Sequence, residues 1–278
     1  MQTNTPLWKR IRLTRRSRIA LVATGAVVAV AGVAAPLTIL HRDEGTRAAL
    51  VIPEGWRARQ VYAAIDKALR LPPGSTRKSL TKTHLDLPES AEGNPEGYLF
   101  PATYPIGERT TPQSLLRYMV TTAKKRFSGV TVAAGAPRSA MNGYRTVTIA
   151  SIVQAEAATP ADMRKVARVV FNRLERGMPL QMDSTLNYAM NRFTLNTTTA
   201  DTRINSLYNS YQRLGLPPTP IANPGEDALR AVLNPTPGDW LYFVTVKPGD
   251  TRFTGSYEEQ QRNVAEFNRL RAGKSPPH

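Results

Sequence analysis

The sequence predicts an α+β protein with a single N-terminal transmembrane helix, a small βα unit and a larger, mostly helical domain that contains a β-hairpin. Three observations support this class. The stretch Ile19 to Leu40 carries no charge. Later segments repeat apolar residues at helical spacing behind capping residues. Two short apolar and aromatic segments flank a KPGD turn. With 278 residues, 41% of them hydrophobic, the chain can bury a substantial core.

The uncharged stretch Ile19 to Leu40 is long enough to cross a bilayer, since as a helix it rises about 33 Å. A cleaved signal peptide is the alternative, because small residues near Ala34 and Ala35 suit a peptidase. The stretch exceeds the usual apolar region of about 7 to 15 residues, which favours an uncleaved anchor. No acid precedes it, and the positive-inside rule then predicts a cytoplasmic N-terminus and export of everything after residue 40. The basic residues before it are Lys9, Arg10, Arg12, Arg15, Arg16 and Arg18.

The composition excludes several classes of chemistry. Without cysteine, the chain has neither a disulfide framework nor a thiolate nucleophile. The three histidines, His41, His84 and His278, have no spacing typical of a Ser-His-Asp triad or a helical zinc site, so we expect no metal and no cofactor. The exported part keeps an excess of about ten positive charges, which favours an anionic lipid or wall polymer over nucleic acid as partner. Scattered, solvated surface charge is the alternative.

The first exported elements are predicted from apolar spacing and turn residues. Leu50 to Ile52 reads as a strand, Pro53 to Gly55 as a turn, and the following segment as a helix with Val61, Ile65 and Leu69 on one face. Residues 72–95 are polar and rich in proline, typical of a connector. Residues 96–106, EGYLFPATYPI, then resemble a strand.

The remaining elements are mostly helices with recognisable starts. Thr111 with Pro112 and Thr159 with Pro160 each predict a helix start, as does the segment 223–226, NPGE. The segments WLYFVTV and TRFTG on either side of KPGD predict a hairpin, and Ser256 with Glu259 predicts a capped final helix.

One acid stands where a hydrophobic residue is expected. Ile149, Ile152 and Val153 form one face of a predicted helix over residues 144–157, and the next position on that face is Glu156. Three interpretations are open: Glu156 is a misplaced surface charge, a structural acid that binds the amides of the next helix, or a carboxyl group kept partly out of water for proton chemistry. Glu96, beside GYLFP, and Asp183, in LQMDST, are weaker candidates: Glu96 could bind a turn, and Asp183 could cap the helix through residues 186–190.

A partly desolvated Glu156 would suit general acid chemistry. Desolvation raises a carboxyl pKa from about 4.3 towards about 6, where the group can hold and donate a proton. Cleavage of a glycosidic bond needs such a group, and an enzyme that lets the sugar's own hydroxyl attack could use one acid alone. Tyr208, Asn209 and Tyr211, in a proline-rigid stretch, suit sugar hydroxyls and ring faces, or else pack inward in an ordered loop.

Five stretches, in this order, resemble the MltG or YceG-like endolytic murein transglycosylase family over roughly residues 49–268. They are EGYLFPATYPI, TIASIVQAEA, VARVVFNRLERGMPLQMDSTLNYAM, YNSYQRLGLPPTPIANPGEDALRAVLNP and LYFVTV. The resemblance implies that Glu156 is the catalytic acid. Gln154 occupies a position that is often acidic in relatives, so Glu156 is the sole acid of its motif. The resemblance also implies substrate contacts from Gln181, Asp183, Ser184, Thr185, Tyr208, Asn209 and Tyr211.

The resemblance further implies cleavage of the MurNAc-GlcNAc β-1,4 bond within nascent peptidoglycan glycan strands, with a 1,6-anhydromuramyl end that terminates elongation. The implied location is the bacterial cytoplasmic (inner) membrane, with peptidoglycan synthases or division proteins as candidate partners. A muramidase-type hydrolase of the same bond and a non-enzymatic, membrane-tethered wall-binding scaffold are the alternatives. The implied layout is a basic tail (1–18), a transmembrane helix (19–40), a linker with a LysM-like unit (41–95), a catalytic domain (96–272) and a tail (273–278).

Two features depart from the family pattern. Gln260 stands where many relatives have histidine, which would alter a cleft contact. The connector of residues 72–95 is short for the family, which leaves the start of the catalytic domain open.

Overall fold

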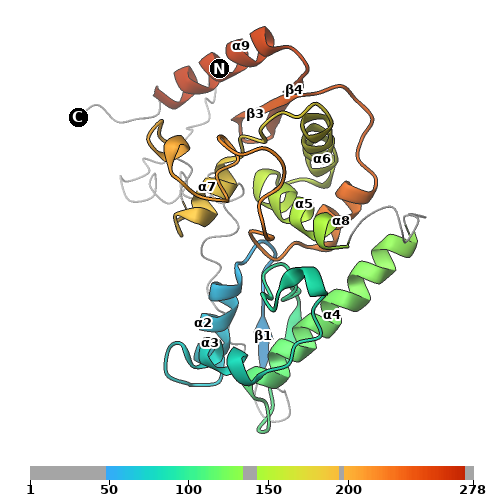
Figure 1. Cartoon of the computed structure of the whole chain (residues 1–278), viewed down its shortest axis with the longest axis vertical. Helices are drawn as coiled ribbons and strands as arrows, with labels where there is room; N and C mark the ends of the chain where they lie inside the picture. The colour runs from blue at the N-terminus through green and yellow to red at the C-terminus, as the bar shows by residue number, and fades with distance from the viewer. Residues whose placement is uncertain (1–47, 134–142, 194–196, 273–278) are drawn as a thin grey trace, which may run out of the picture.

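A computed structural model of the chain describes residues 48–133, 143–193 and 197–272 (Figure 1). The predicted transmembrane stretch lies outside these residues, and no described helix is long and apolar enough to cross a membrane. The helices are α2 (Ala58–Ala68), α3 (Ser75–Ser79), α4 (Pro112–Ala133), α5 (Gly143–Glu156), α6 (Pro160–Glu175), α7 (Asp183–Ala189), α8 (Glu226–Leu233) and α9 (Tyr257–Ala272). The strands are β1 (Ala49–Val51), β2 (Thr103–Pro105), β3 (Tyr242–Lys247) and β4 (Asp250–Thr254). Mixed helices and small sheets make this an α+β protein, as predicted.

The N-terminal unit has the order β1, α2, α3, β2. The two strands pair antiparallel, with Leu50 opposite Tyr104, and α2 buries Val61 and Ile65 beneath them as the sequence predicts. Figure 1 shows this unit at the lower end of the molecule. The polar stretch of residues 72–95 contains helix α3 in addition to turns, because the buried Asp66 carboxylate accepts hydrogen bonds from the residues that begin it.

The larger part of the molecule is built around α5. Helices α6 and α8 pack against it, and its predicted apolar face, Ile149, Ile152 and Val153, is completely buried. The long helix α4 contacts α2 and α3 on one side and α8 on the other, so one continuous core runs through both parts. Where the parts meet, Gly97 adopts φ +86°, and a Cβ there would lie 2.7 Å from Pro220.

The predicted helix caps and hairpin are confirmed. Thr159 accepts a hydrogen bond from the Asp162 amide at the start of α6, and Ser256 accepts one from the Glu259 amide at the start of α9. Strands β3 and β4 form the antiparallel hairpin, and α9 packs against β3. The Gln260 side chain on α9 donates to a β3 carbonyl at 3.1 Å, so its amide helps to dock the helix on the hairpin.

Candidate active site

Glu156 is the last residue of α5, where the helix meets the start of α7. One carboxylate oxygen, Oε1, accepts hydrogen bonds from the Ser184 hydroxyl at 2.6 Å and the Ser184 amide at 3.3 Å. In the part of the chain that the structure describes, the other oxygen, Oε2, accepts none. The residue is half-buried. Its carboxyl group is therefore held at one oxygen and free to meet a ligand at the other.

The surroundings of Glu156 favour its protonated form. Desolvation is the largest cause that raises the pKa of this carboxyl group, and the negative charge of Asp183 raises it further. The two hydrogen bonds from Ser184 act in the opposite direction, because they stabilise the carboxylate. Since burial dominates, Glu156 keeps its proton to a higher pH than an ordinary glutamate.

Asp183 brings a second carboxyl group close to Glu156. Its Oδ1 accepts a hydrogen bond of 2.5 Å from the Tyr211 hydroxyl. Asp183 is the first residue of α7, and Met182 occupies the capping position before it. The alternative that Asp183 caps this helix is therefore wrong, because Met182 holds the capping position. The Asp183 carboxylate instead accepts a hydrogen bond from Tyr211, which lies in a loop 28 residues further along the chain.

Ser210 joins that loop to the start of α7. Its hydroxyl accepts from the Met182 amide at 2.9 Å and shares a 2.8 Å hydrogen bond with the Thr185 hydroxyl, while its carbonyl accepts from the Gln181 amide. These bonds fix the position of Tyr211 relative to Asp183. Sequence reasoning missed Ser210, although it lies between two residues that were singled out, because a serine carries no pattern of its own.

The remaining predicted contacts fall into two groups. Thr185 is fully buried, and Asn209 is 1% exposed, with its amide donating to two carbonyls of its own loop. Both residues thus support the site from beneath. Gln181 is exposed, and its side-chain oxygen accepts a hydrogen bond from Arg173. Tyr208 is half-buried, and its hydroxyl lies 2.8 Å from that of Thr219.

Glu96 lies at a different place in the molecule. It is 4% exposed and accepts hydrogen bonds from the Ala58 amide and the Tyr188 hydroxyl, so it joins α2 to α7. The sequence analysis offered a turn as the partner of Glu96. In the structure, the carboxylate binds the first amide of α2 instead. Tyr188 was not predicted, because the contact spans 92 residues of chain.

The neighbour of Glu156 in its motif, Gln154, is engaged elsewhere. Its Oε1 accepts from the Gly225 amide at 2.9 Å, and its amide also hydrogen-bonds the Glu54 carboxylate. Gln154 therefore connects α5 to the turn after β1 and to the start of α8. Within the described residues, no hydrogen bond joins the Gln154 side chain to Glu156.

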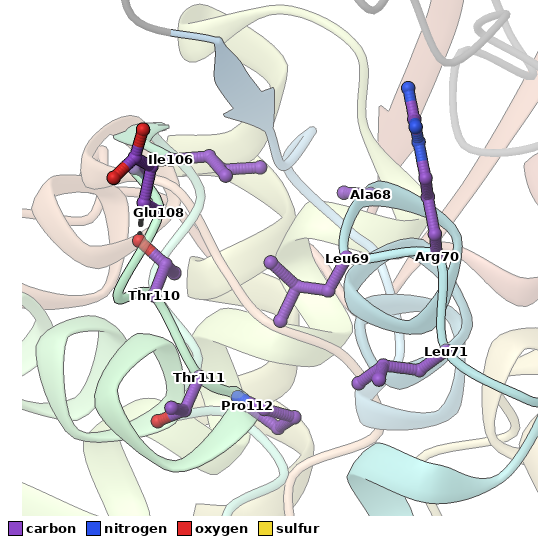
Figure 2. A pocket seen from close by; sticks show the side chains of 10 residues that line it. Ala68, Leu69, Arg70, Leu71, Ile106, Glu108, Thr110, Thr111 and Pro112 are labelled. Atoms are coloured by element: carbon purple, nitrogen blue, oxygen red, sulfur yellow. Dashed lines mark hydrogen bonds between the residues drawn. The ribbon is translucent and has the colours of Figure 1, made fainter.

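A hollow of about 370 Å³ lies between the end of α2 and the segment before α4 (Figure 2). Leu69 and Ile106 point into it, with Glu108 and Thr110 at its edge. It belongs to the N-terminal unit and does not include Glu156. Among the described residues, no group of three or more His, Cys, Asp or Glu side chains is placed to hold a metal ion.

The family model described as the YceG-like family matches residues 30–266. The chain belongs to the YceG-like family. Among relatives of this YceG-like chain, an endolytic murein transglycosylase from Streptococcus pneumoniae is 40% identical over 62% of the chain and 32% of its own length. One from Bacillus subtilis is 37% identical over 60% of the chain and 46% of its own length. The chain thus spans less than half the length of these curated relatives.

A solved structure is also similar. The crystal structure of a yceG-like protein from Listeria monocytogenes superposes with a TM-score of 0.66 at 28% identity, covering 78% of this chain and 76% of that chain. The described fold of the YceG-like chain is therefore shared with a protein of the same family.

Proposed function

We propose that this protein is a membrane-anchored endolytic peptidoglycan transglycosylase. It cleaves the MurNAc-GlcNAc β-1,4 bond within nascent glycan strands, leaves a 1,6-anhydromuramyl end and so ends elongation of the strand. One observation carries the proposal: Glu156 is a half-buried carboxyl group whose pKa is raised by burial, held at one oxygen by Ser184 and free at the other. The relatives named endolytic murein transglycosylase support the same reaction.

In the first step, protonated Glu156 acts as the general acid. Its free oxygen, Oε2, gives the proton to the oxygen that links the two sugars. The bond from that oxygen to C1 of MurNAc breaks, its electron pair stays on the oxygen, and GlcNAc leaves with a hydroxyl group. Positive charge develops at C1, and the nearby Asp183 carboxylate stabilises it electrostatically.

In the second step, the Glu156 carboxylate acts as a base. It takes the proton from the C6 hydroxyl of the same MurNAc, and the C6 oxygen forms its bond to C1. This closes the 1,6-anhydro ring and returns the proton to Glu156, so no water is consumed. Ser184 supports both steps, because its two hydrogen bonds hold the carboxyl group in one orientation while its charge changes.

The other predicted residues line or support the glycan site in this proposal. Tyr208, Tyr211 and Gln181 offer exposed or half-buried polar and aromatic groups to the sugars. The buried Thr185 and Asn209 keep the loop and α7 in place through hydrogen bonds within the protein.

The wider architecture is also part of the proposal. We infer a basic cytoplasmic tail (1–18), a transmembrane helix (19–40) and an extracytoplasmic part. That part consists of a LysM-like unit within residues 41–95 and a catalytic domain over residues 96–272. Helices α2 and α3 and strand β1 support a compact binding unit, and β2, the partner of β1 from the start of the catalytic range, joins this unit to the catalytic part. The excess of basic residues favours work beside an anionic lipid or wall polymer.

A muramidase of the same bond is the second candidate, and the position of Asp183 favours it. Enzymes that hydrolyse glycosidic bonds commonly use two carboxyl groups, and Asp183 lies near enough to Glu156 to raise its pKa. In that reaction water would attack C1 in place of the C6 hydroxyl, and the product would have a reducing end.

Product analysis tests the proposal. The full-length protein, in detergent, is incubated with purified uncrosslinked peptidoglycan strands, and the new ends are identified by mass spectrometry. Anhydromuramyl ends within the strand support the transglycosylase. Reducing ends indicate the muramidase, and binding without either product indicates a wall-binding scaffold.

A further inference from the structure

Arg173 is a buried cation on α6, 6% exposed, whose hydrogen bonds within the described residues go to neutral oxygens. Its Nε donates to the Leu241 carbonyl at 2.6 Å. Its Nη1 donates to the carbonyls of Pro179 and Leu180, both at 2.9 Å, and to the side-chain oxygen of Gln181 at 3.1 Å. Because Nη1 carries two protons, one of them is shared between two acceptors. Arg173 therefore fixes the segment that leads into α7.

Gln181 has an uncommon backbone conformation in that segment. Its φ is +53°, in the left-handed region that residues other than glycine rarely occupy. Two contacts from other segments hold it there: its amide donates to the Ser210 carbonyl at 2.9 Å, and its side-chain oxygen accepts from Arg173. Strain of this kind persists only where the surrounding structure enforces it, and it is concentrated at ligand-binding sites.

The bond from Arg173 decides which end of the Gln181 amide faces outward. A guanidinium group only donates, so the amide atom that meets it is the oxygen, Oε1. The nitrogen, Nε2, lies on the other side of the amide, and within the described residues no hydrogen bond engages it. Gln181 is exposed. It therefore offers N–H donors to a ligand.

This donor lies beside the acids of the proposed reaction. Tyr211 donates to Asp183, which comes two residues after Gln181. Burial raises the pKa of Tyr211, the charge of Glu156 raises it further and the charge of Arg173 lowers it, so these groups share one region.

The charges and the donor together favour one kind of acceptor on the glycan. A carboxylate of the glycan would be repelled by Asp183. A sugar hydroxyl can donate as well as accept, so a donor selects it only weakly. The carbonyl of an acetamido group is neutral and only accepts, and it is therefore the best match for the Gln181 amide.

We propose that Gln181 is a specificity-determining residue whose outward N–H group donates to an acetamido carbonyl of the glycan, and that Arg173 is the positioning residue that sets this polarity. The inference rests on the proposed function, because it takes a glycan strand as the ligand. It deepens that function by naming the chemical group that is recognised.

Binding of two ligands tests the inference without cleavage. Full-length Glu156→Gln protein in detergent is titrated by calorimetry with uncrosslinked glycan strands, either N-acetylated or de-N-acetylated. Adding Gln181→Met should weaken binding of the N-acetylated strands roughly 3- to 10-fold, the effect of one lost hydrogen bond. Binding of the de-N-acetylated strands, which lack the carbonyl, should not change.

Gln181→Glu inverts the outward group and keeps the contact with Arg173. One carboxylate oxygen still accepts from the guanidinium, while the other presents an acceptor where the amide presented a donor. Binding of N-acetylated strands should weaken, and binding of de-N-acetylated strands should strengthen, because their amino groups can donate to the carboxylate. The urea midpoint should also be higher for Gln181→Glu than for Gln181→Met, since only the former keeps a bond to Arg173.

Arg173→Lys tests the positioning role. Lysine keeps the positive charge but cannot reproduce the fork of a guanidinium group. The ratio of the two dissociation constants should change as it does in Gln181→Met, and the double variant should change it no further. A purely structural role would weaken binding of both ligands equally. If Arg173→Lys does not fold, the urea midpoints of the two variants at the exposed Gln181 decide whether Arg173 holds this side chain.

The matched control is Gln113→Glu, which makes the same change on α4, a helix that packs against α2, α3 and α8. It should leave both affinities unchanged. Equal losses for both ligands with Gln181→Met, or no loss with the N-acetylated strands, would overturn the inference. Failure of the Glu156→Gln protein to bind either ligand would instead count against the proposed function.

Discussion

Replacing Glu96 with glutamine should remove a pH-dependent loss of folding stability. Glu96 has an ordinary pKa of 4.5 in the unfolded chain and a pKa of about 7 in the folded protein, because burial disfavours its charge. Between these values the folded state holds a proton that the unfolded state has lost. The free energy of unfolding therefore falls as pH rises, in total by about 3 kcal/mol at about 1.36 kcal/mol per pKa unit.

The assay is urea unfolding of the full-length protein and the Glu96→Gln variant in the same detergent, at about pH 4.5 and about pH 8.5. Burial also raises the pKa values of Glu156 and Glu54, which give slopes of the same sign in both proteins. The informative quantity is therefore the difference between the two pH dependences. The variant should lose less stability than the wild type on going to the higher pH. Identical pH dependences would refute the reasoning, since Glu96 would then not be desolvated in the folded protein.

Three further substitutions have defined outcomes. Ser184→Ala removes the hydroxyl hydrogen bond that stabilises the Glu156 carboxylate and keeps the bond from the backbone amide, so kcat should fall while the alkaline limb of the pH-rate profile moves to higher pH. Asp183→Asn removes a negative charge that raises the pKa of Glu156, so the alkaline limb should move to lower pH. A shift of the limb in the same direction in both variants would contradict these opposite effects on Glu156. Gly97→Ala should lower the free energy of unfolding in urea by about 2 to 4 kcal/mol, because the new Cβ would clash with Pro220 and the backbone has a positive φ. An unchanged urea midpoint would contradict the close packing of Gly97 against Pro220.

The parts of the fold that depend on residues close together in the sequence were predictable from it. The helix starts at Thr159 and Ser256 follow from local capping chemistry, and both caps are present. The buried face of α5 follows from helical spacing, which also made Glu156 stand out. Helix α3 was not predicted, since its five residues carry no apolar period and depend on Asp66.

The contacts that build the site depend on tertiary structure and could not be predicted from spacing. The Glu156 to Ser184 and the Tyr211 to Asp183 hydrogen bonds each span 28 residues. The resemblance implied that Glu156 is the catalytic acid and that the other three residues are substrate contacts, but it did not indicate that they bind one another. Ser210 is a similar case, because its role arises from the fold of a loop rather than from any local motif.

Steady-state cleavage by the Glu156→Gln variant tests the central claim most directly. Glutamine keeps the shape of the side chain and an acceptor for Ser184, but it cannot donate and recover a proton at the scissile bond. We expect glycan binding close to that of the wild type and turnover reduced by about 10² to 10⁴. Turnover at the wild-type rate would contradict the claim that this carboxyl group carries the reaction.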